Sequence, residues 1–269
     1  MNAPIFIPND EYHARSEISK SQLDVFHNNK NGLQWLKKCP IDKEKIKTFD
    51  FGTACHEILL EPDAFRNNFV IAPELNLRTK EDRETLRLFK IEHRNKKILT
   101  NDDHKKLSLM FESVMADPAA RYWIEAAGVA EGSWFWTDPD TGVECRCRPD
   151  KDILNTRFLM DIKSTDTIKK FNFSVDDYRY YVQAPLYTDG LTANGVEKEE
   201  MIFLVMQKTI DCGRYPVKCV RLPIDAIRFG RSEYKRDLHN LAEYRQKNKI
   251  ILADTLEMSR NFNYRMEGK

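Results

Sequence analysis

The chain has 269 residues, with 43 Lys and Arg against 42 Asp and Glu, so its formal charge is +1. This balance identifies no nucleic-acid, membrane or acidic partner by itself. Hydrophobic residues make up 41% of the chain and aromatic residues 11%, which suffices for a sizeable core and excludes disorder over most of the length. No apolar run approaches the roughly 18–20 residues of a membrane span. The composition therefore predicts a globular protein without a membrane partner.

Residues 1–10 contain no charged stretch followed by a long apolar run. We therefore expect no secretory signal, a cytoplasmic location and six reduced cysteines. No C-x-x-C pair occurs, and Cys145 and Cys147 lie two apart in a β-type run. Core packing explains this pair better than a zinc site does.

The first half of the sequence has the pattern of helices. Ser19 and Gln22 have capping-box spacing at the start of a helical segment over 18–39, which breaks near 28–32. Helical patterns follow over 49–60, which carries His56, and over 79–115, with an interruption at 100–102. The pair Asp117-Pro118 predicts the start of a further short helix. Residues 1–127 are thus expected to form a helical N-terminal part.

From Gly128 onward the sequence changes to short β-type runs. They lie at 133–136, 143–147, 158–162 and 201–206, and they predict a sheet. Helices are expected over 174–191 and 224–247. We expect one domain of α/β or α+β class over 1–250, with a sheet core over about 128–222, a C-terminal helix over about 223–249 and a possible tail over 250–269.

The segment 145–165 carries the residues best suited to chemistry. If Asn155 and Thr156 form a two-residue hairpin loop, the numbers of facing residues sum to 311, and Asp150 lies opposite Asp161. Opposed residues have Cβ atoms roughly 4.5–5.5 Å apart, close enough for both carboxylates to bind one divalent cation. The period of two then places Lys163 on the face of Asp161 and turns Ile162 into the core.

Two carboxylates at this distance repel each other unless a cation or a proton neutralises one of them. Mg²⁺ suits such a pair because it favours a few carboxylates together with waters and a substrate phosphate. A neighbouring lysine can then orient the attacking water. The alternative is an ordinary Asp–Lys ion pair at the end of a surface strand.

The pattern Pro149-Asp150 followed by Asp161-Ile162-Lys163 resembles the signature of PD-(D/E)xK nucleases, in the form found among RecB-like nucleases. Two further motifs of that family are matched. The segment Phe51–His56 resembles its histidine motif, and Gln183 with Tyr187 resembles its Q-x-x-x-Y motif, whose members share one helical face. The opening, residues 18–23 leading to Cys39-Pro40, is also similar. Over about residues 8–247 the chain resembles the RecE-like exonuclease VIII family of prophage recombination.

This resemblance implies a restriction-endonuclease-like core, with a central mixed β-sheet flanked by helices and a helical N-terminal portion. It implies that His56, Asp150 and Asp161 bind Mg²⁺, with Mn²⁺ as a substitute, together with the main-chain carbonyl of Ile162. Glu131 lies where relatives often place another acidic residue near the metals.

For the remaining motif residues, the resemblance implies that Lys163 positions and activates the attacking water. Gln183 and Tyr187 would support the site or the DNA end. Pro185 lies between these two residues, where it removes a helical N–H, so the helix is expected to begin late or to kink there.

The implied activity is that of a Mg²⁺-dependent exodeoxyribonuclease. It would degrade the 5′-ended strand of linear double-stranded DNA and leave 3′ overhangs for a single-strand annealing protein, as a ring-shaped homo-oligomer. The alternatives are a Cas4-like or endonucleolytic PD-(D/E)xK nuclease, and a non-catalytic DNA-binding module that keeps the fold.

Two further expectations concern ligands. Some RecB-like nucleases hold an iron–sulfur cluster, but Cys212 and Cys219 leave the downstream cysteine group incomplete, so we expect no cluster. Basic residues just before the helix that carries His56 are candidates for contact with DNA phosphates: Lys43, Lys45 and Lys47.

Overall fold

The computed structural model describes residues 3–41, 47–76, 78–247 and 251–253, without the side chains of residues 47–50. Its centre is a five-stranded mixed sheet of order β3-β6-β7-β8-β9, in which only the β7–β8 pair is parallel. The five strands are β3 (Gly128–Ala130), β6 (Lys151–Ile153), β7 (Phe158–Thr165), β8 (Glu200–Gln207) and β9 (Val217–Arg221). The predicted class, a mixed sheet flanked by helices, is confirmed.

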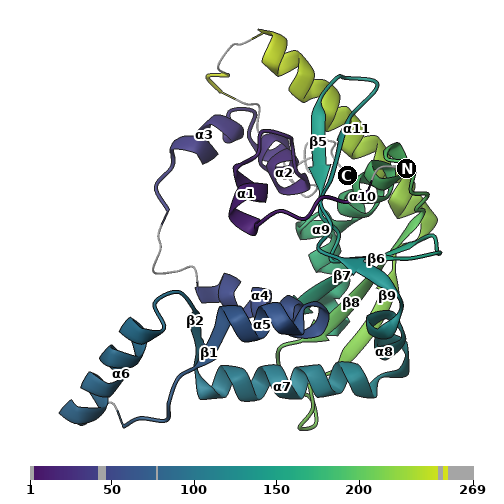
Figure 1. Ribbon diagram of the computed structural model, residues 1–269. Coiled ribbons are helices and arrows are strands. Elements are labelled where there is room, and N and C mark those ends of the chain that lie inside the picture. The colour runs from purple at the N-terminus through teal and green to yellow at the C-terminus, as the bar shows by residue number, and fades with distance from the viewer. Residues whose placement is uncertain (1–2, 42–46, 77, 248–250, 254–269) are drawn as a thin grey trace, which may run out of the picture.

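Helices form a layer on each side of this sheet (Figure 1). The elements of the first layer are α4 (Lys47–Leu60), α5 (Pro62–Asn68), α7 (Asn101–Ala116) and α8 (Pro118–Glu125), with the short parallel pair β1 (Phe69–Ile71) and β2 (Lys97–Leu99). Helix α6 (Lys80–Glu92) projects away from this layer (Figure 1). The other side carries α1 (Asn9–Ala14), α2 (Lys20–Asn28), α3 (Gly32–Lys38), α9 (Phe171–Asp177), α10 (Tyr180–Ala193) and α11 (Ile224–Lys247), with the hairpin β4 (Trp134–Thr137) and β5 (Glu144–Cys147). The sheet thus separates a first apolar core, on the side of α4, α7 and α8, from a second, on the side of α9 and α10. A third apolar cluster lies between α2, β5, α10 and α11.

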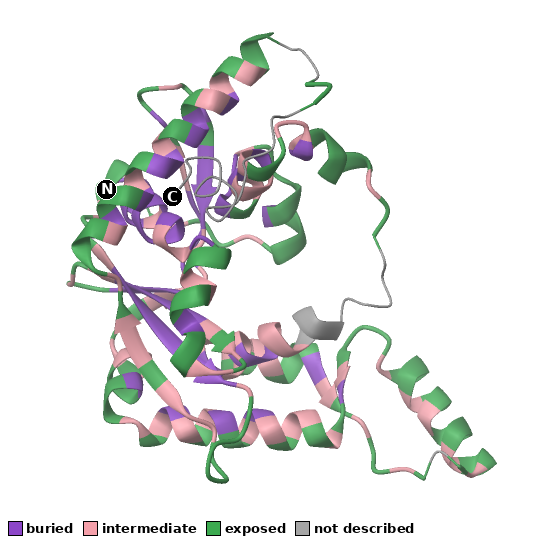
Figure 2. Cartoon of the chain, turned by 180° about the vertical axis from the view of Figure 1, so that it is seen from behind, coloured by how far each residue is buried: buried purple, intermediate pink, exposed green. Residues whose placement is uncertain are grey.

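Successive side chains of the central strands point alternately into the first and the second core. Met160 and Ile162 of β7 pack toward α4, α7 and α8, whereas Leu159 packs toward α9 and α10. On β8, Leu204 faces the first core and Phe203 the second, and both faces are buried (Figure 2). This explains the unbroken apolar run of β8, which a strand with one solvated face would not need.

Several predicted elements are confirmed. The capping box of Ser19 and Gln22 begins α2, the side chain of Asp117 caps α8, and the helix over 224–247 is α11. The break expected near 28–32 separates α2 from α3. Within the described ranges, no helix combines the length and apolarity that a membrane span needs.

Three predictions of element boundaries were wrong. The runs at 133–136 and 143–147 form a separate hairpin, not part of the main sheet. The helix over 174–191 is two helices, α9 and α10, because Arg179 adopts a left-handed conformation. The loop between β6 and β7 is four residues long, 154–157, yet its centre is unchanged, so the facing residues still sum to 311.

Pro185 lies inside α10, which runs on to Ala193. Proline has no N–H, so Pro185 cannot donate the usual helical hydrogen bond to the carbonyl of Tyr181, four residues earlier. Helix α11 passes this carbonyl at Gly230, where an added Cβ would lie 1.7 Å from the oxygen. The close packing of α10 on α11 therefore requires glycine at this position.

A pair of glycine-to-alanine substitutions tests this packing. Gly230→Ala should destabilise the fold by about 1–3 kcal/mol or more, because backbone must move to admit the methyl group. Gly52→Ala, in α4, meets no atom within 4 Å and should leave stability unchanged or raise it by up to about 1 kcal/mol. Urea unfolding of both variants measures the difference, and equal stabilities would contradict the packing argument.

Candidate active site

Three carboxylates lie in one row across adjacent strands. The β3–β6 register, which pairs Ala130 with Lys151, continues to Glu131 and Asp150, and the amide of Glu131 donates to the carbonyl of Asp150 at 3.1 Å. The β6–β7 register, which pairs Lys151 with Met160, continues to Asp150 and Asp161. The predicted opposition of the two aspartates follows directly from this register.

Glu131 enters the row through a turn of the backbone. Its φ of 53° is left-handed, a region that residues other than glycine seldom adopt, and it directly follows the end of β3. The sequence predicts no strand before residue 133. In the structure Glu131 directly follows β3, a strand that was not predicted, and the pairing of β3 with β6 aligns it with Asp150.

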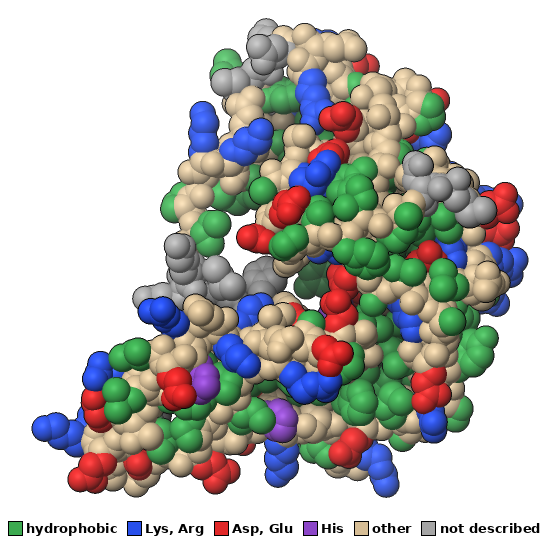
Figure 3. All heavy atoms as spheres, viewed as in Figure 1, with side chains coloured by type: hydrophobic (Ala, Val, Ile, Leu, Met, Phe, Trp, Pro, Cys, Tyr) green, Lys and Arg blue, Asp and Glu red, His purple; other side chains and the backbone are tan. Residues whose placement is uncertain are grey.

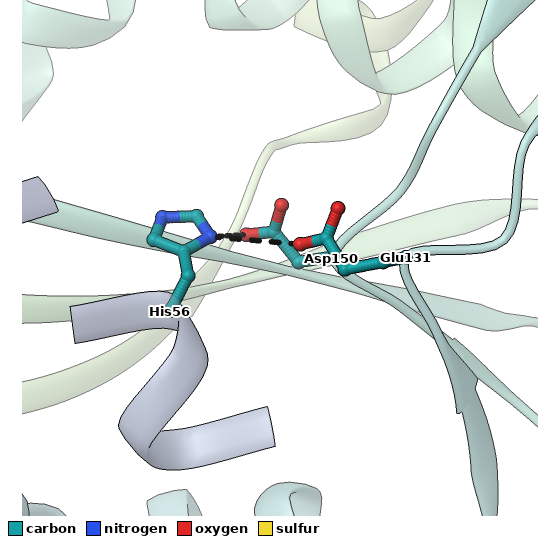
Figure 4. Close-up of side chains that lie close together, drawn as sticks. All are labelled: His56, Glu131 and Asp150. Carbon is teal, nitrogen blue, oxygen red and sulfur yellow. Dashed lines mark ion pairs between the residues drawn. The ribbon is translucent and has the colours of Figure 1, made fainter. Parts of the chain in front are cut away.

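His56 reaches this row from α4. Ala54, Cys55 and Leu59 of this helix are buried in the first core, while His56 is partly exposed. Its Nδ1 atom lies 3.3 Å from Oδ2 of Asp150 and 4.0 Å from Oε1 of Glu131 (Figure 4). Residues separated by 94 positions therefore meet at one point.

Asp161 is held by two residues of its own face. Its Oδ1 accepts a hydrogen bond from the side-chain amide of Gln183 on α10, and its Oδ2 lies 2.5 Å from the ammonium of Lys163. The side chain of Asp161 is only 3% exposed. Asp150, in turn, accepts the backbone N–H of Ile162. The two aspartates are thus oriented by neighbours on β7 and α10.

The pKa values of these groups shift because charges are crowded in a buried place. Burial would lower the pKa of His56, but the carboxylates of Asp150, Asp161 and Glu131 raise it to about 9. Burial, together with the Asp150 carboxylate, raises the pKa of Glu131 to about 8. Burial likewise opposes the charge of Lys163, yet Asp161 and Asp150 raise its pKa above the usual value. The site therefore favours bound positive charge.

The donor set fits a hard divalent cation. Ligand atoms of His56, Glu131 and Asp150 all lie within 4.8 Å of one another, and among the residues that the structure describes they are the one such group of three or more. Carboxylate oxygens with one imidazole nitrogen suit Mg²⁺ or Mn²⁺. Asp161 is outside this group, and its oxygens contact Gln183 and Lys163.

A hollow of about 770 Å³ opens onto His56 and Glu131. Its walls come from residues 6–9 on one side and from α4 and α5 on the other, with Arg148 beside them. Figure 3 shows this hollow below α1 and above α4 and α5, with acidic side chains gathered beside it. The candidate metal ligands are therefore accessible to an extended ligand from solvent.

The predicted site residues also include Tyr187, Ile162 and three lysines. Tyr187 lies one turn beyond Gln183 on α10, and burial raises its pKa well above the usual value, which keeps the phenol neutral. Ile162 is buried in the first core, as predicted. Of the proposed DNA-binding lysines, Lys43 and Lys45 lie outside the described residues, and Lys47 begins α4 with its side chain outside the description.

Sequence reasoning missed two residues beside the site. The Tyr180 ring centroid lies 4.5 Å from the ammonium of Lys163. Arg148 lines the hollow, donates to Ser133 and stacks on the Tyr12 ring at 4.0 Å. Arg148 precedes Asp150 by two residues, so the strand period could have placed both on one face. For Tyr180 the sequence carries no comparable signal, since its position depends on the break before α10.

Residues 19–250 match the family described as a PDDEXK-like domain of unknown function (DUF3799). The chain belongs to this family. The match covers every residue of the proposed site, and the PD-(D/E)xK resemblance of the sequence is confirmed. PD-(D/E)xK nucleases use divalent metals, in keeping with the donor set of the site.

A solved structure has a similar fold. A putative exonuclease from Eubacterium rectale is similar with a TM-score of 0.62 at 10% identity, over 94% of this chain and 97% of that one. An alkaline exonuclease from Laribacter hongkongensis is 15% identical, with a TM-score of 0.35 over 90% of this chain and 97% of that one. None of the curated protein sequences matches. The fold is therefore that of a PDDEXK-like domain.

Removal of one carboxylate charge tests the metal site. Asp150→Asn keeps an acceptor for the N–H of Ile162 but loses a charged ligand, so affinity for Mn²⁺ or Mg²⁺ should fall by at least about tenfold. Isothermal titration calorimetry measures this change. Asp140→Asn, which removes an exposed carboxylate paired with Lys235, is the control and should bind metal as the wild type does. Unchanged affinity in Asp150→Asn would contradict the assignment.

Proposed function

We propose that the protein is a metal-dependent exodeoxyribonuclease that degrades the 5′-ended strand of linear duplex DNA and leaves 3′ overhangs. The observation that carries this proposal is the juxtaposition of the Lys163–Asp161 pair with the group of His56, Glu131 and Asp150. This set of residues combines candidate ligands for a divalent cation with a cationic donor beside them. The family and the fold support nuclease chemistry, and the motif resemblance supports the finer activity.

Hydrolysis of a phosphodiester requires in-line attack by water and neutralisation of the charge that builds on the phosphate oxygens. A divalent cation held by His56, Glu131, Asp150 and Asp161, with the Ile162 carbonyl, would supply most of that positive charge. Mg²⁺ is the cation we propose, with Mn²⁺ as a substitute.

Lys163 has the role of orienting water and phosphate. Nearby carboxylates favour its ammonium form, which donates hydrogen bonds to the attacking water and to a phosphate oxygen. The pairing with Asp161 restricts the position of this ammonium, so little reorganisation is needed when the substrate arrives.

Gln183 and Tyr187 act from α10. Gln183 donates to Asp161 and so holds its second oxygen toward Lys163. Tyr187 supports the same side of the site as a neutral phenol. Both are positioning residues in this proposal.

The biological setting follows the same resemblance. We propose linear double-stranded DNA as the substrate, a ring-shaped homo-oligomer that encircles it, and a single-strand annealing protein as the user of the 3′ overhang. Lys43, Lys45 and Lys47 remain the proposed phosphate contacts, since binding of duplex DNA depends on local positive charge.

Digestion of end-labelled DNA tests the activity. Wild type with Mg²⁺ should release the 5′ label from linear duplex and leave a covalently closed circle intact, and EDTA should stop the reaction. Lys163→Ala should lower the rate by about 100-fold or more, because it removes a charge that acts on the transition state. Lys218→Ala, an exposed lysine on the edge strand β9, is the matched control.

Other outcomes identify the alternatives. Cleavage of the circle would assign an endonuclease or a Cas4-like enzyme. Release of the 3′ label first would reverse the polarity. Duplex binding without cleavage by folded wild type would assign a non-catalytic DNA-binding module.

A second substitution separates positioning from binding. Gln183→Ala should reduce kcat by roughly 10- to 100-fold while KM for duplex DNA stays near the wild-type value, because the Asp161 carboxylate loses its orientation but the DNA surface is unchanged. Steady-state kinetics on linear duplex measure both constants. Gln34→Ala, an exposed residue on α3, should alter neither. A change confined to KM would contradict a positioning role.

A further inference from the structure

We infer that the ring of Tyr178 binds an unpaired DNA base next to the cleavage site, an inference that rests on the proposed nuclease function. Tyr178 follows α9, and its side chain is 61% exposed. It does not stand alone, because its ring stacks on Tyr180 with centroids 5.6 Å apart and an interplanar angle of 25°. One face of the ring is thus covered by Tyr180, and the exposure of the side chain leaves the other face open.

The stack continues into the core and passes beside the proposed catalytic lysine. Tyr180 stacks in turn on Phe203 of β8, with centroids 5.8 Å apart and an interplanar angle of 27°. The Tyr180 ring also lies 4.5 Å from the ammonium of Lys163. Tyr178 is therefore the outermost ring of a stack whose next member contacts the site of chemistry.

This arrangement depends on an unusual backbone conformation. In a continuous helix, residues two apart point in different directions and cannot stack. Arg179 interrupts the helix with φ 49° and ψ 45°, a left-handed conformation that is disfavoured for arginine. Its guanidinium is held by Asp24 at 2.9 Å and by Asp237 at 2.7 Å. Buried ion pairs thus maintain the strained residue that brings the two tyrosines together.

Two lysines lie beside the stack, and each is paired with a carboxylate. The ammonium of Lys20 donates to the carbonyl of Tyr178 and lies 5.8 Å from the Tyr180 centroid. Lys163 supplies a second cation, while Asp24 pairs with Lys20 at 2.6 Å. The open aromatic face of Tyr178, at the end of the stack, is the kind of surface on which proteins that bind single-stranded DNA stack a base.

Stacking also fits an enzyme that must accept any sequence. Every base has a π-face, so an aromatic platform holds a base without reading its hydrogen-bonding edge. A base stacked on Tyr178 would fix the nucleotide whose phosphate lies toward Lys163. The ring would therefore retain the frayed end of the strand at the cleavage site without sequence preference.

Binding of a short single-stranded oligonucleotide with 2-aminopurine at its 5′ end tests this role. Ca²⁺ replaces Mg²⁺ so that the DNA stays intact, which a gel verifies. The wild type and Tyr178→Phe should quench the fluorescence by stacking. Tyr178→Ala should lose the quenching and bind roughly 5- to 150-fold more weakly. Phe173→Ala is the matched control, because Phe173 is 60% exposed on α9 but belongs to no ring stack found among the described residues.

An oligonucleotide with an abasic 5′ nucleotide completes the test. Wild type and Tyr178→Ala should bind it with equal affinity, since no base is present to stack. Full quenching and affinity in Tyr178→Ala, or an equal loss in Phe173→Ala, would overturn the inference. Wild-type cleavage of duplex DNA, measured in parallel, separates this failure from failure of the proposed function, which would show as intact duplex.

Discussion

Mutual repulsion of three carboxylates at one level of the sheet is the constraint on which the site depends. Glu131, Asp150 and Asp161 occupy neighbouring strands, and two unit charges about 4 Å apart interact by roughly 4 kcal/mol even at an effective dielectric constant of 20. Without metal, the imidazole of His56 and the ammonium of Lys163 compensate this charge. A divalent cation would meet the same electrostatic need with greater charge.

The layers of the fold bring the partners of these carboxylates from different directions. Helix α4, packed on one face of the sheet, carries His56, and α10, packed on the other face, carries Gln183. Between them, β7 is held by the parallel strand β8, which is buried on both faces. Because all three elements are anchored in apolar cores, packing fixes their backbones, and the contacts of Asp161 with Gln183 and Lys163 then orient the side chains.

The junction of α9 and α10 connects this site to the surface. Arg179 ends one helix and begins the next, and its ion pairs with α2 and α11 tie the junction to the rest of the second layer. The close approach of α11 to α10 at Gly230 also holds the start of α10 in place. The position of Tyr180 beside Lys163 is therefore a consequence of helix packing far from the strand that carries the lysine.

The sequence by itself determined the features that depend on local periodicity and motif. Asp150, Asp161 and Lys163 could be placed on one face because the strand period and the centre of the β6–β7 loop fix which residues oppose, whatever the loop length. The capping box of Ser19 and the long helix α11 were likewise readable from spacing alone. These are local properties of the chain.

Only the tertiary structure decided the rest. The short strand β3 has no pattern of its own, so the alignment of Glu131 with Asp150 required the neighbouring strand to be in place. The break at Arg179 depends on two acidic partners that are distant in sequence, Asp24 before it and Asp237 after it. The meeting of His56 with Asp150 needs α4 to pack on the sheet. Each of these contacts is non-local, and no periodicity within one segment specifies which distant residues a folded chain brings together.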